Sequence, residues 1–216
     1  MLKQSPAQPM LKLDTEELKI YNRDGDEMHS ADQYSDFLGI TMKDFIEFLV
    51  RKKLSFHYAD LSYLDLEGAN LTGGVFTRTS FANTNLTNAN CTDTKFTLAV
   101  ISETKLINAN FSKALIIQTQ FNKTDLDKVN FSFTQFFQNQ VIESSLSNAN
   151  FYKSKIDSNF FRKVNLNKSD FSKATIHNTE FEFSNLNNCS FENCKVTKCQ
   201  LSDTSLIDTL YLSLIE

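Results

Sequence analysis

The chain has 216 residues and, with 22 basic against 26 acidic side chains, a formal net charge of −4. That length suits one domain or at most two, and only 5 Gly and 2 Pro argue against a linker-rich or disordered chain. No apolar stretch is long enough to cross a membrane, and residues 1–15 lack the apolar core of a secretory signal, so we expect the protein to fold in a cytoplasm.

The N-terminal region, residues 1–53, carries no internal repeat. Leu11 to Tyr21, followed by the turn-forming residues 22–26, predicts a hairpin or an irregular segment. Ser30 to Leu38, ended by Gly39, predicts a short helix.

A second helix is predicted over residues 42–52. Thr41 and Asp44 have the spacing of a capping box at its start. Apolar side chains then recur on one face, at Met42, Phe45, Ile46 and Leu49.

A five-residue repeat begins after this helix. Every fifth residue from Phe56 to Leu206 is apolar or Cys without a break in register, and the residue two before each centre is almost always small. This period would drift around a helix and would change faces along a strand. The chain must therefore turn once per repeat, with the small residue and the centre both pointing inward.

The number of repeats in one coil follows from the columns of like residues. Every fourth centre in one column is leucine: Leu66, Leu86, Leu106, Leu126, Leu146, Leu166, Leu186 and Leu206. Another column holds five phenylalanines in succession: Phe111, Phe131, Phe151, Phe171 and Phe191. Like residues stack when successive coils repeat one environment, so four repeats make one coil.

Four runs resemble the A-(D/N)-L-x-x motif of pentapeptide-repeat proteins: residues 69–72, 89–92, 109–112 and 149–152. The resemblance implies an all-β solenoid, a right-handed quadrilateral parallel β-helix of about eight coils over residues 54–208. A solenoid needs its open end covered, so we predict that the helix at 42–52 is an N-terminal cap, with a partner-binding helix as the alternative.

The C-terminal segment, residues 209–216, permits two readings. If the register continues, Leu210, Leu212 and Leu214 point outward and suit a homodimer contact. If the register stops near Asp208, the same leucines fold over the last coil as a cap. Both interpretations stay open.

Outward-pointing apolar residues gather in the middle coils, on two adjoining faces. A contiguous exposed apolar patch usually marks an interface with a partner or a second copy of the chain, whereas singly scattered apolar residues are normal on a protein surface. Both interpretations stay open. The candidate partner-binding residues are Leu98, Val100, Leu115, Ile117, Phe137, Ile142 and Phe160.

No catalytic, cofactor-binding or metal-binding residues are predicted. Cys189, Cys194 and Cys199 recur every five residues, but they occupy the small inward position and Cys91 occupies a centre, so we interpret all four as buried packing residues. There is no Gly-rich phosphate loop. Acidic and basic residues intermix along the repeats without a basic stripe, so no direct binding of nucleic acid is expected.

These observations favour a non-enzymatic scaffold that offers a rigid side to a protein partner. The layout resembles bacterial effector-type members of the family, which implies a bacterial cytoplasm and delivery into a host cell. The alternative is a DNA-mimicking protein that binds topoisomerases, similar to Qnr-type quinolone-resistance proteins. The mixed charge argues against that alternative, because mimicry of DNA requires ordered negative charge.

Overall fold

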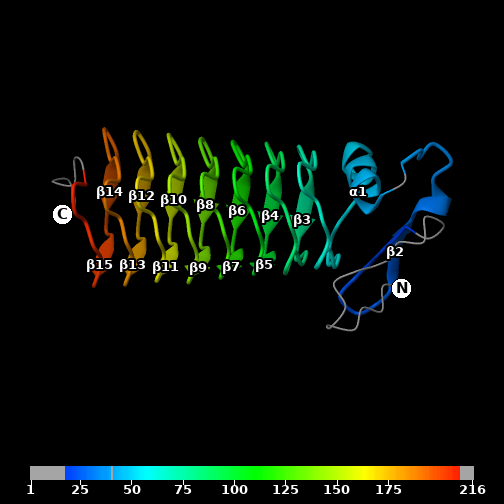
Figure 1. The fold of residues 1–216 in the computed structure, drawn as a ribbon, viewed down its shortest axis with the longest axis horizontal. Coiled ribbons are helices and arrows are strands. Elements are labelled where there is room, and N and C mark those ends of the chain that lie inside the picture. The colour runs from blue at the N-terminus through cyan, green and yellow to red at the C-terminus, as the bar shows by residue number, and fades with distance from the viewer. Residues whose placement is uncertain (1–17, 40, 210–216) are drawn as a thin grey trace.

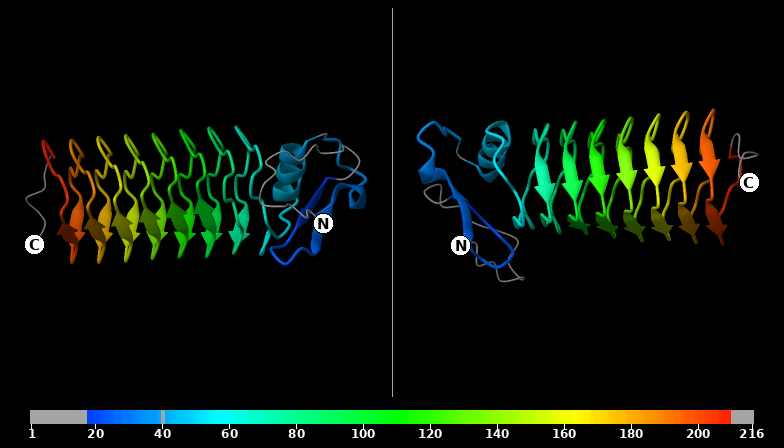
Figure 2. Two further views of the ribbon diagram at one scale, coloured as in Figure 1. Left: turned by 60° about the horizontal axis from the view of Figure 1, so that its bottom comes forward. Right: turned by 180° about the vertical axis from the view of Figure 1, so that it is seen from behind.

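A parallel β-solenoid forms a rod along most of the chain, with an N-terminal hairpin and helix at one end (Figure 1). The computed structural model describes residues 18–39 and 41–209. Two further views show the same arrangement, with the coils stacked along the rod and the N-terminal elements at its beginning (Figure 2). The predicted solenoid is thus confirmed.

Two walls of the rod are parallel sheets in which neighbouring strands are twenty residues apart, as in Lys95↔Leu115 and Val100↔Gln120. The first sheet contains β3 (Val75–Thr77), β4 (Lys95–Thr97), β6 (Leu115–Ile117), β8 (Gln135–Phe137), β10 (Lys155–Asp157), β12 (Thr175–His177) and β14 (Lys195–Thr197). The second sheet contains β5 (Val100–Ser102), β7 (Gln120–Asn122), β9 (Gln140–Ile142), β11 (Phe160–Arg162), β13 (Glu180–Glu182) and β15 (Gln200–Ser202).

The other two walls carry the Asn or Asp of the repeat motif and are joined by single bridges such as Asn70↔Asn90 and Asn110↔Asn130. Here the amide oxygen of Asn110 accepts the backbone N–H of Ser112 at 3.0 Å. The amide of Asn130 donates to Asn110 in the preceding coil at 3.1 Å. These side chains therefore fix the local turn, because Asn and Asp readily hydrogen-bond the backbone two residues further on.

Each repeat turns at a corner residue in the left-handed region, such as Asn83 with φ 58° or Lys113 with φ 61°. Only Gly68 and Gly73 relieve the steric cost of that conformation at the corners. Elsewhere the corners hold side chains, including Asn and Asp, which tolerate this region best. Corner side chains of successive coils form four rows along the rod.

The interior is filled by the predicted columns. Bridges Asp125↔Ser145 and Ser145↔Asn165 place Leu126, Leu146 and Leu166 directly over one another, and all three are buried. In the phenylalanine column, ring centroids of successive coils lie 4.9 Å apart between Phe151 and Phe171. This stacking of residues twenty apart confirms that four repeats make one coil.

Polar residues in the small inward position hydrogen-bond to the preceding coil. The hydroxyl of Thr124, for example, donates to the carbonyl oxygen of Ile101 at 2.8 Å. The amide of Asn139 donates to the Ile116 carbonyl at 3.0 Å, and its oxygen accepts the N–H of Thr119 at 2.9 Å. A buried Asn is stabilised here because its donors and acceptor find partners between coils.

The helix α1 (Met42–Arg51) lies against the first coil. The Thr41 hydroxyl accepts the N–H of Asp44 at 3.1 Å, so the predicted capping box exists. Besides the predicted face, Phe48 and Val50 are also buried. Phe48 is buried on a second side of the helix, where its ring meets Tyr34 and Phe37 at centroid distances of 5.4 and 5.3 Å.

An antiparallel hairpin precedes α1 and consists of β1 (Lys19–Tyr21) and β2 (Glu27–Ser30). Its end bonds to the first coil, where the N–H of Asp60 donates to the Tyr21 carbonyl at 2.8 Å. The prediction of a helix from Ser30 to Leu38 is wrong. Only one 3₁₀ turn forms, at Ala31–Gln33, because the following aromatic side chains pack onto α1 instead.

Glu47 joins α1 to the edge of the first coil, and its removal tests whether this helix acts as a cap. The Glu47 carboxylate accepts the backbone N–H of Asn70 at 2.8 Å. For Glu47→Ala we expect faster amide exchange in residues 60–73, with unchanged exchange beyond residue 120, and a loss of about 1 kcal/mol. Hydrogen exchange measured residue by residue checks this result.

Arg51→Ala is the matched control, because it removes the cation 4.0 Å from Glu47 but leaves the bond to Asn70. Uniform exchange along the whole rod after Glu47→Ala would contradict a capping role. The division of the chain at residue 53 itself stays a prediction.

Candidate functional site

Three of the predicted partner-binding residues lie together on the first sheet. Leu115 and Ile117 both point outward from β6, and Ile117 pairs directly with Phe137 on β8. All three side chains are half-buried by their neighbours rather than fully exposed. We call Leu115, Ile117 and Phe137 the apolar patch.

The remaining predicted residues are spread over the second sheet and the corner before it. Val100, Ile142 and Phe160 lie on β5, β9 and β11, and each pairs with polar or charged residues in the coils above and below. Leu98, with 40% of its surface exposed, stands at the corner between the sheets. It lines a shallow hollow with Gln118, Thr119, Gln120, Gln138 and Gln140.

A row of lysines along another corner was missed from the sequence, where no basic stripe was recognised. Two adjoining rows form this edge: the corner residues Asp93, Lys113, Phe133, Lys153 and Lys173, and the first strand residues Lys95, Leu115, Gln135, Lys155, Thr175 and Lys195. We call Lys95, Lys113, Lys153, Lys155, Lys173 and Lys195 the lysine edge. All six are exposed.

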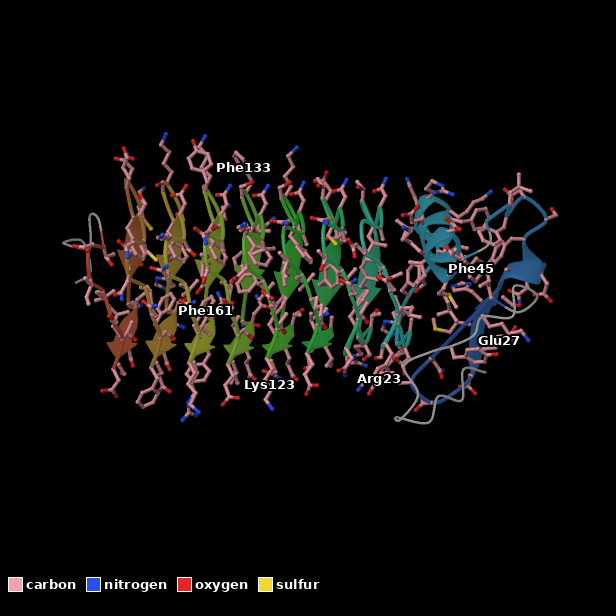
Figure 3. All side chains as sticks on the ribbon, in the orientation of Figure 1. Arg23, Glu27, Phe45, Lys123, Phe133 and Phe161 are labelled. Carbon is pink, nitrogen blue, oxygen red and sulfur yellow. The ribbon has the colours of Figure 1, made fainter. Side chains whose placement is uncertain are left out.

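Backbone bonds between coils keep the lysine edge straight. The N–H of Lys113 donates to Ser132 at 3.0 Å, and that of Lys153 donates to Ser172 at 3.1 Å. Figure 3 shows Phe133, a member of the same corner row, on the upper side of the rod, with Lys123 on the lower side. The two positions belong to opposite corners.

Two aromatic rings lie beside the lysine edge and contact the ammonium groups of two of its lysines. Phe133 and Tyr152 meet edge to face at 5.8 Å, and the ammonium of Lys153 lies 5.6 and 5.2 Å from their centroids. The Tyr152 hydroxyl also accepts a hydrogen bond from Lys173 at 3.5 Å. This bond, and then the charges of Lys153 and Lys173, lowers the pKa of Tyr152, which indicates a positive local field.

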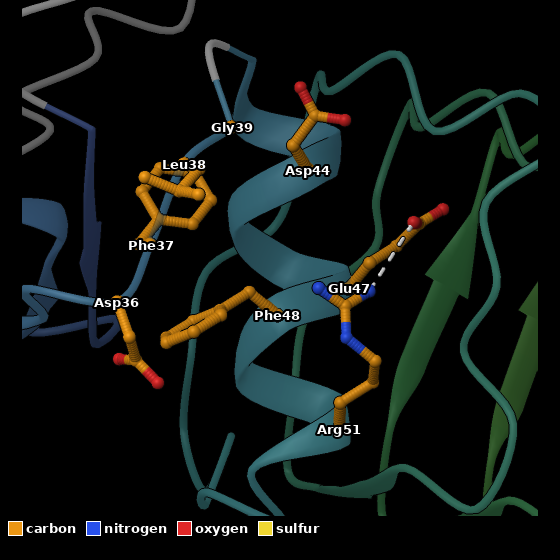
Figure 4. Close-up of a pocket in the computed structure, with 8 residues that line it drawn as sticks. All are labelled: Asp36, Phe37, Leu38, Gly39, Asp44, Glu47, Phe48 and Arg51. Atoms are coloured by element: carbon orange, nitrogen blue, oxygen red, sulfur yellow. Dashed lines mark ion pairs between the residues drawn. The ribbon is translucent and has the colours of Figure 1, made fainter.

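A second hollow, of about 320 Å³, lies between α1 and residues 36–39 (Figure 4). Its acidic side chains have structural partners: Asp36 pairs with Lys52, and Glu47 lies 4.0 Å from Arg51. The hydrogen bond from Lys52 lowers the pKa of Asp36. Asp44 belongs to the capping box. These groups hold the N-terminal region together, and we assign no chemistry to them.

Cys91, Cys189 and Cys194 are buried, as expected from the register, whereas Cys199 is only partly buried. The Cys189 thiol donates to the Leu166 carbonyl at 3.1 Å, the same bond that Thr or Ser makes in other coils. Burial raises the pKa of Cys189 and of Cys194 to about 12, so both thiols stay protonated at neutral pH. Within residues 18–39 and 41–209, no three His, Cys, Asp or Glu side chains converge to hold a metal ion.

Two further expectations concern the ends of the chain and membranes. Leu210, Leu212 and Leu214 lie outside the described residues, so the choice between a cap and a dimer contact stays a prediction. Over the part of the chain that the structure describes, no helix has the length and apolar character needed to cross a membrane.

Comparison with protein families gives one match, to a family described as pentapeptide repeats. It contributes 8 copies over residues 54–73, 65–102, 75–112, 104–138 and 144–193, which together cover more than half of the chain. No curated protein matches.

Several solved structures are similar to this chain. HetL from the cyanobacterium Nostoc sp. strain PCC 7120, involved in regulation of heterocyst differentiation, is 17% identical, with a TM-score of 0.38 over 69% of this chain and 73% of HetL. Full-length QnrB1, a plasmid-mediated fluoroquinolone resistance protein, is 14% identical, with a TM-score of 0.28 over 71% of this chain and 92% of QnrB1. Both TM-scores are below 0.5, so neither likeness indicates a function for this chain.

Proposed function

This chain belongs to the pentapeptide-repeat family, and from that premise we propose that it acts as a rigid, non-enzymatic scaffold that binds a protein partner. Because its interior is filled by leucine and phenylalanine columns, other molecules meet only the outer walls. A rod held by bonds between every pair of coils loses little conformational entropy on binding.

The apolar patch is the observation that supports this proposal. Ile117 and Phe137 stand side by side on paired strands, and Leu115 adds a third apolar side chain two residues from Ile117. Patches of this kind, surrounded by polar residues, mark interaction sites more often than isolated apolar residues do. The flat parallel sheet would present them to a partner without rearrangement.

The test is a triple variant, Leu115→Ser, Ile117→Asn and Phe137→Ser. We expect it to lose the protein partner recovered by the wild type from cell lysates, because the apolar centre of an interface carries most of its binding energy. Affinity recovery followed by mass spectrometry measures the loss. Light scattering on the same samples reports any change in oligomeric state.

Phe183→Ser is the control, since this phenylalanine is 52% exposed but stands at a corner residue outside the first sheet. It should retain the partner. Thermal unfolding of each variant shows whether the fold survives, since outward substitutions on the rod are expected to change stability only modestly. Equal recovery of the partner by the triple variant would refute the proposal.

We do not advance the DNA-mimicking alternative. Mimicry of a duplex requires rows of negative charge. On the corner that would offer the most carboxylates, Glu103, Lys123, Glu143 and Lys163 alternate in sign, and Lys163 pairs with Glu143 at 3.1 Å. A bacterial cytoplasm, or a host cell after delivery, stays the expected location, and fractionation of expressing cells tests it.

A further inference from the structure

We propose that the partner surface is completed by the lysine edge, and that it binds an acidic amphipathic segment of a partner protein. Apolar side chains of that segment would contact the apolar patch, and its carboxylates would follow the lysines. This inference rests on the proposed scaffold function and specifies the chemistry of the partner.

The lysine edge carries a local excess of positive charge. Its two rows carry six lysines and one carboxylate, Asp93, and the adjoining row of Ile117 and Phe137 adds a second carboxylate, Asp157, beside Phe137. The chain as a whole has a net charge of −4, so the sign of the charge on the lysine edge is opposite to that of the whole molecule. Such a segregated field attracts and orients an anionic partner.

No ion pair among the described residues neutralises these charges. Among the described residues, the ion pairs involve Lys19, Arg51, Lys52, Arg162 and Lys163, and none involves the lysine edge. Lys153 contacts two aromatic rings through its ammonium but remains an exposed residue without a carboxylate partner. The edge is therefore available for pairing with external carboxylates.

The apolar patch lies next to the lysine edge. Leu115 belongs to the same strand row as Lys95 and Lys155, so the patch directly borders the lysines. An apolar centre with a charged rim is the usual composition of a protein interface. A nucleic acid would gain nothing from covering Leu115, Ile117 and Phe137, and the faces of Phe133 and Tyr152 already carry Lys153.

The length of the partner segment follows from the coil spacing. Lys95 and Lys195 are five coils apart. At about 4.8 Å per coil the edge is roughly 24 Å long. A helix of about 16 residues spans the same distance.

The probe is therefore a synthetic helical peptide of about 16 residues, with Leu on one face and Glu on the other. A second peptide replaces every Glu with Gln. Affinities for the full-length chain are measured by fluorescence anisotropy at low and high salt. Single-stranded oligothymidylate and vesicles containing phosphatidylserine are assayed in parallel.

The critical variant is Lys113→Glu with Lys153→Glu and Lys173→Glu. The control is Lys123→Glu with Lys128→Glu and Lys168→Glu, which changes the net charge equally but on two other corners. We expect the critical variant to weaken binding of the Glu peptide at least about tenfold and the control to change it less than about threefold. High salt should weaken the wild-type complex.

Four outcomes overturn this inference: equal affinity for the Gln peptide, equal losses in both variants, no binding of the Glu peptide, or tighter binding of oligothymidylate or vesicles. The proposed scaffold function is judged separately by the apolar-patch variant and its recovered partner. If the apolar-patch variant loses its partner while the Glu and Gln peptides bind with equal affinity, the scaffold function is supported and the acidic character of the partner is refuted.

Discussion

Replacing Leu146 with Asp is expected to abolish cooperative folding of the central coils. Leu146 is fully buried between Leu126 and Leu166 and has no polar neighbour in its column. An unpaired carboxylate there must either lose its hydration or take up a proton, and we expect a loss of roughly 4 kcal/mol or more. Urea unfolding followed by circular dichroism measures it.

Leu146→Met is the matched control, because it keeps the volume and apolar character and should cost less than about 1.5 kcal/mol. A Leu146→Asp protein that unfolds at the urea concentration of the wild type would contradict the filled interior. It would also remove the reason for confining function to the outer walls.

Replacing Phe151 with Ala should be the next most damaging change. The Phe151 ring lies 5.1 Å from Phe131 and 4.9 Å from Phe171, almost parallel to the latter. Truncation leaves a cavity in the stack, and we expect a loss of about 3–5 kcal/mol. Because each coil contacts mainly its neighbours, the cavity should also uncouple the two halves of the rod.

The measurement for Phe151→Ala combines urea unfolding with hydrogen exchange. We expect a broader transition and faster exchange in the coils after residue 151 than in those before it, because the first coils retain their N-terminal contacts. Phe183→Ala serves as the control, since Phe183 is 52% exposed. A sharp transition with uniform exchange would show that the rod unfolds as one unit.

Much of the solenoid could be predicted because its information is periodic. The spacing from Phe56 to Leu206 and the leucine column define the coil without knowledge of distant contacts. The helix α1 could be predicted equally well, since Thr41 and Asp44 give a local start signal. Both features depend on residues close together in the chain.

The missing parts depend on contacts between residues far apart in the chain. The pairing of Tyr21 with Asp60 and the burial of Phe48 by Tyr34 have no periodic signal. The lysine edge was overlooked for a different reason. Lys155 and Asp157 are only two residues apart on β10, but Lys155 stands in the strand row of the lysine edge, whereas Asp157 stands in the row of Ile117 and Phe137. Reading charges at intervals of twenty residues would have found it.

The independence of the coils has a consequence for how such a protein can change over generations. An insertion of five residues adds one wall and preserves the interior, yet it turns every later wall by a quarter of a circle. If the insertion fell between Leu115 and Lys155, these two residues would lie on different walls, although each would keep its local packing. Lineages can thus lose a composite surface without losing the rod, and only additions of twenty residues lengthen the rod while keeping its walls aligned.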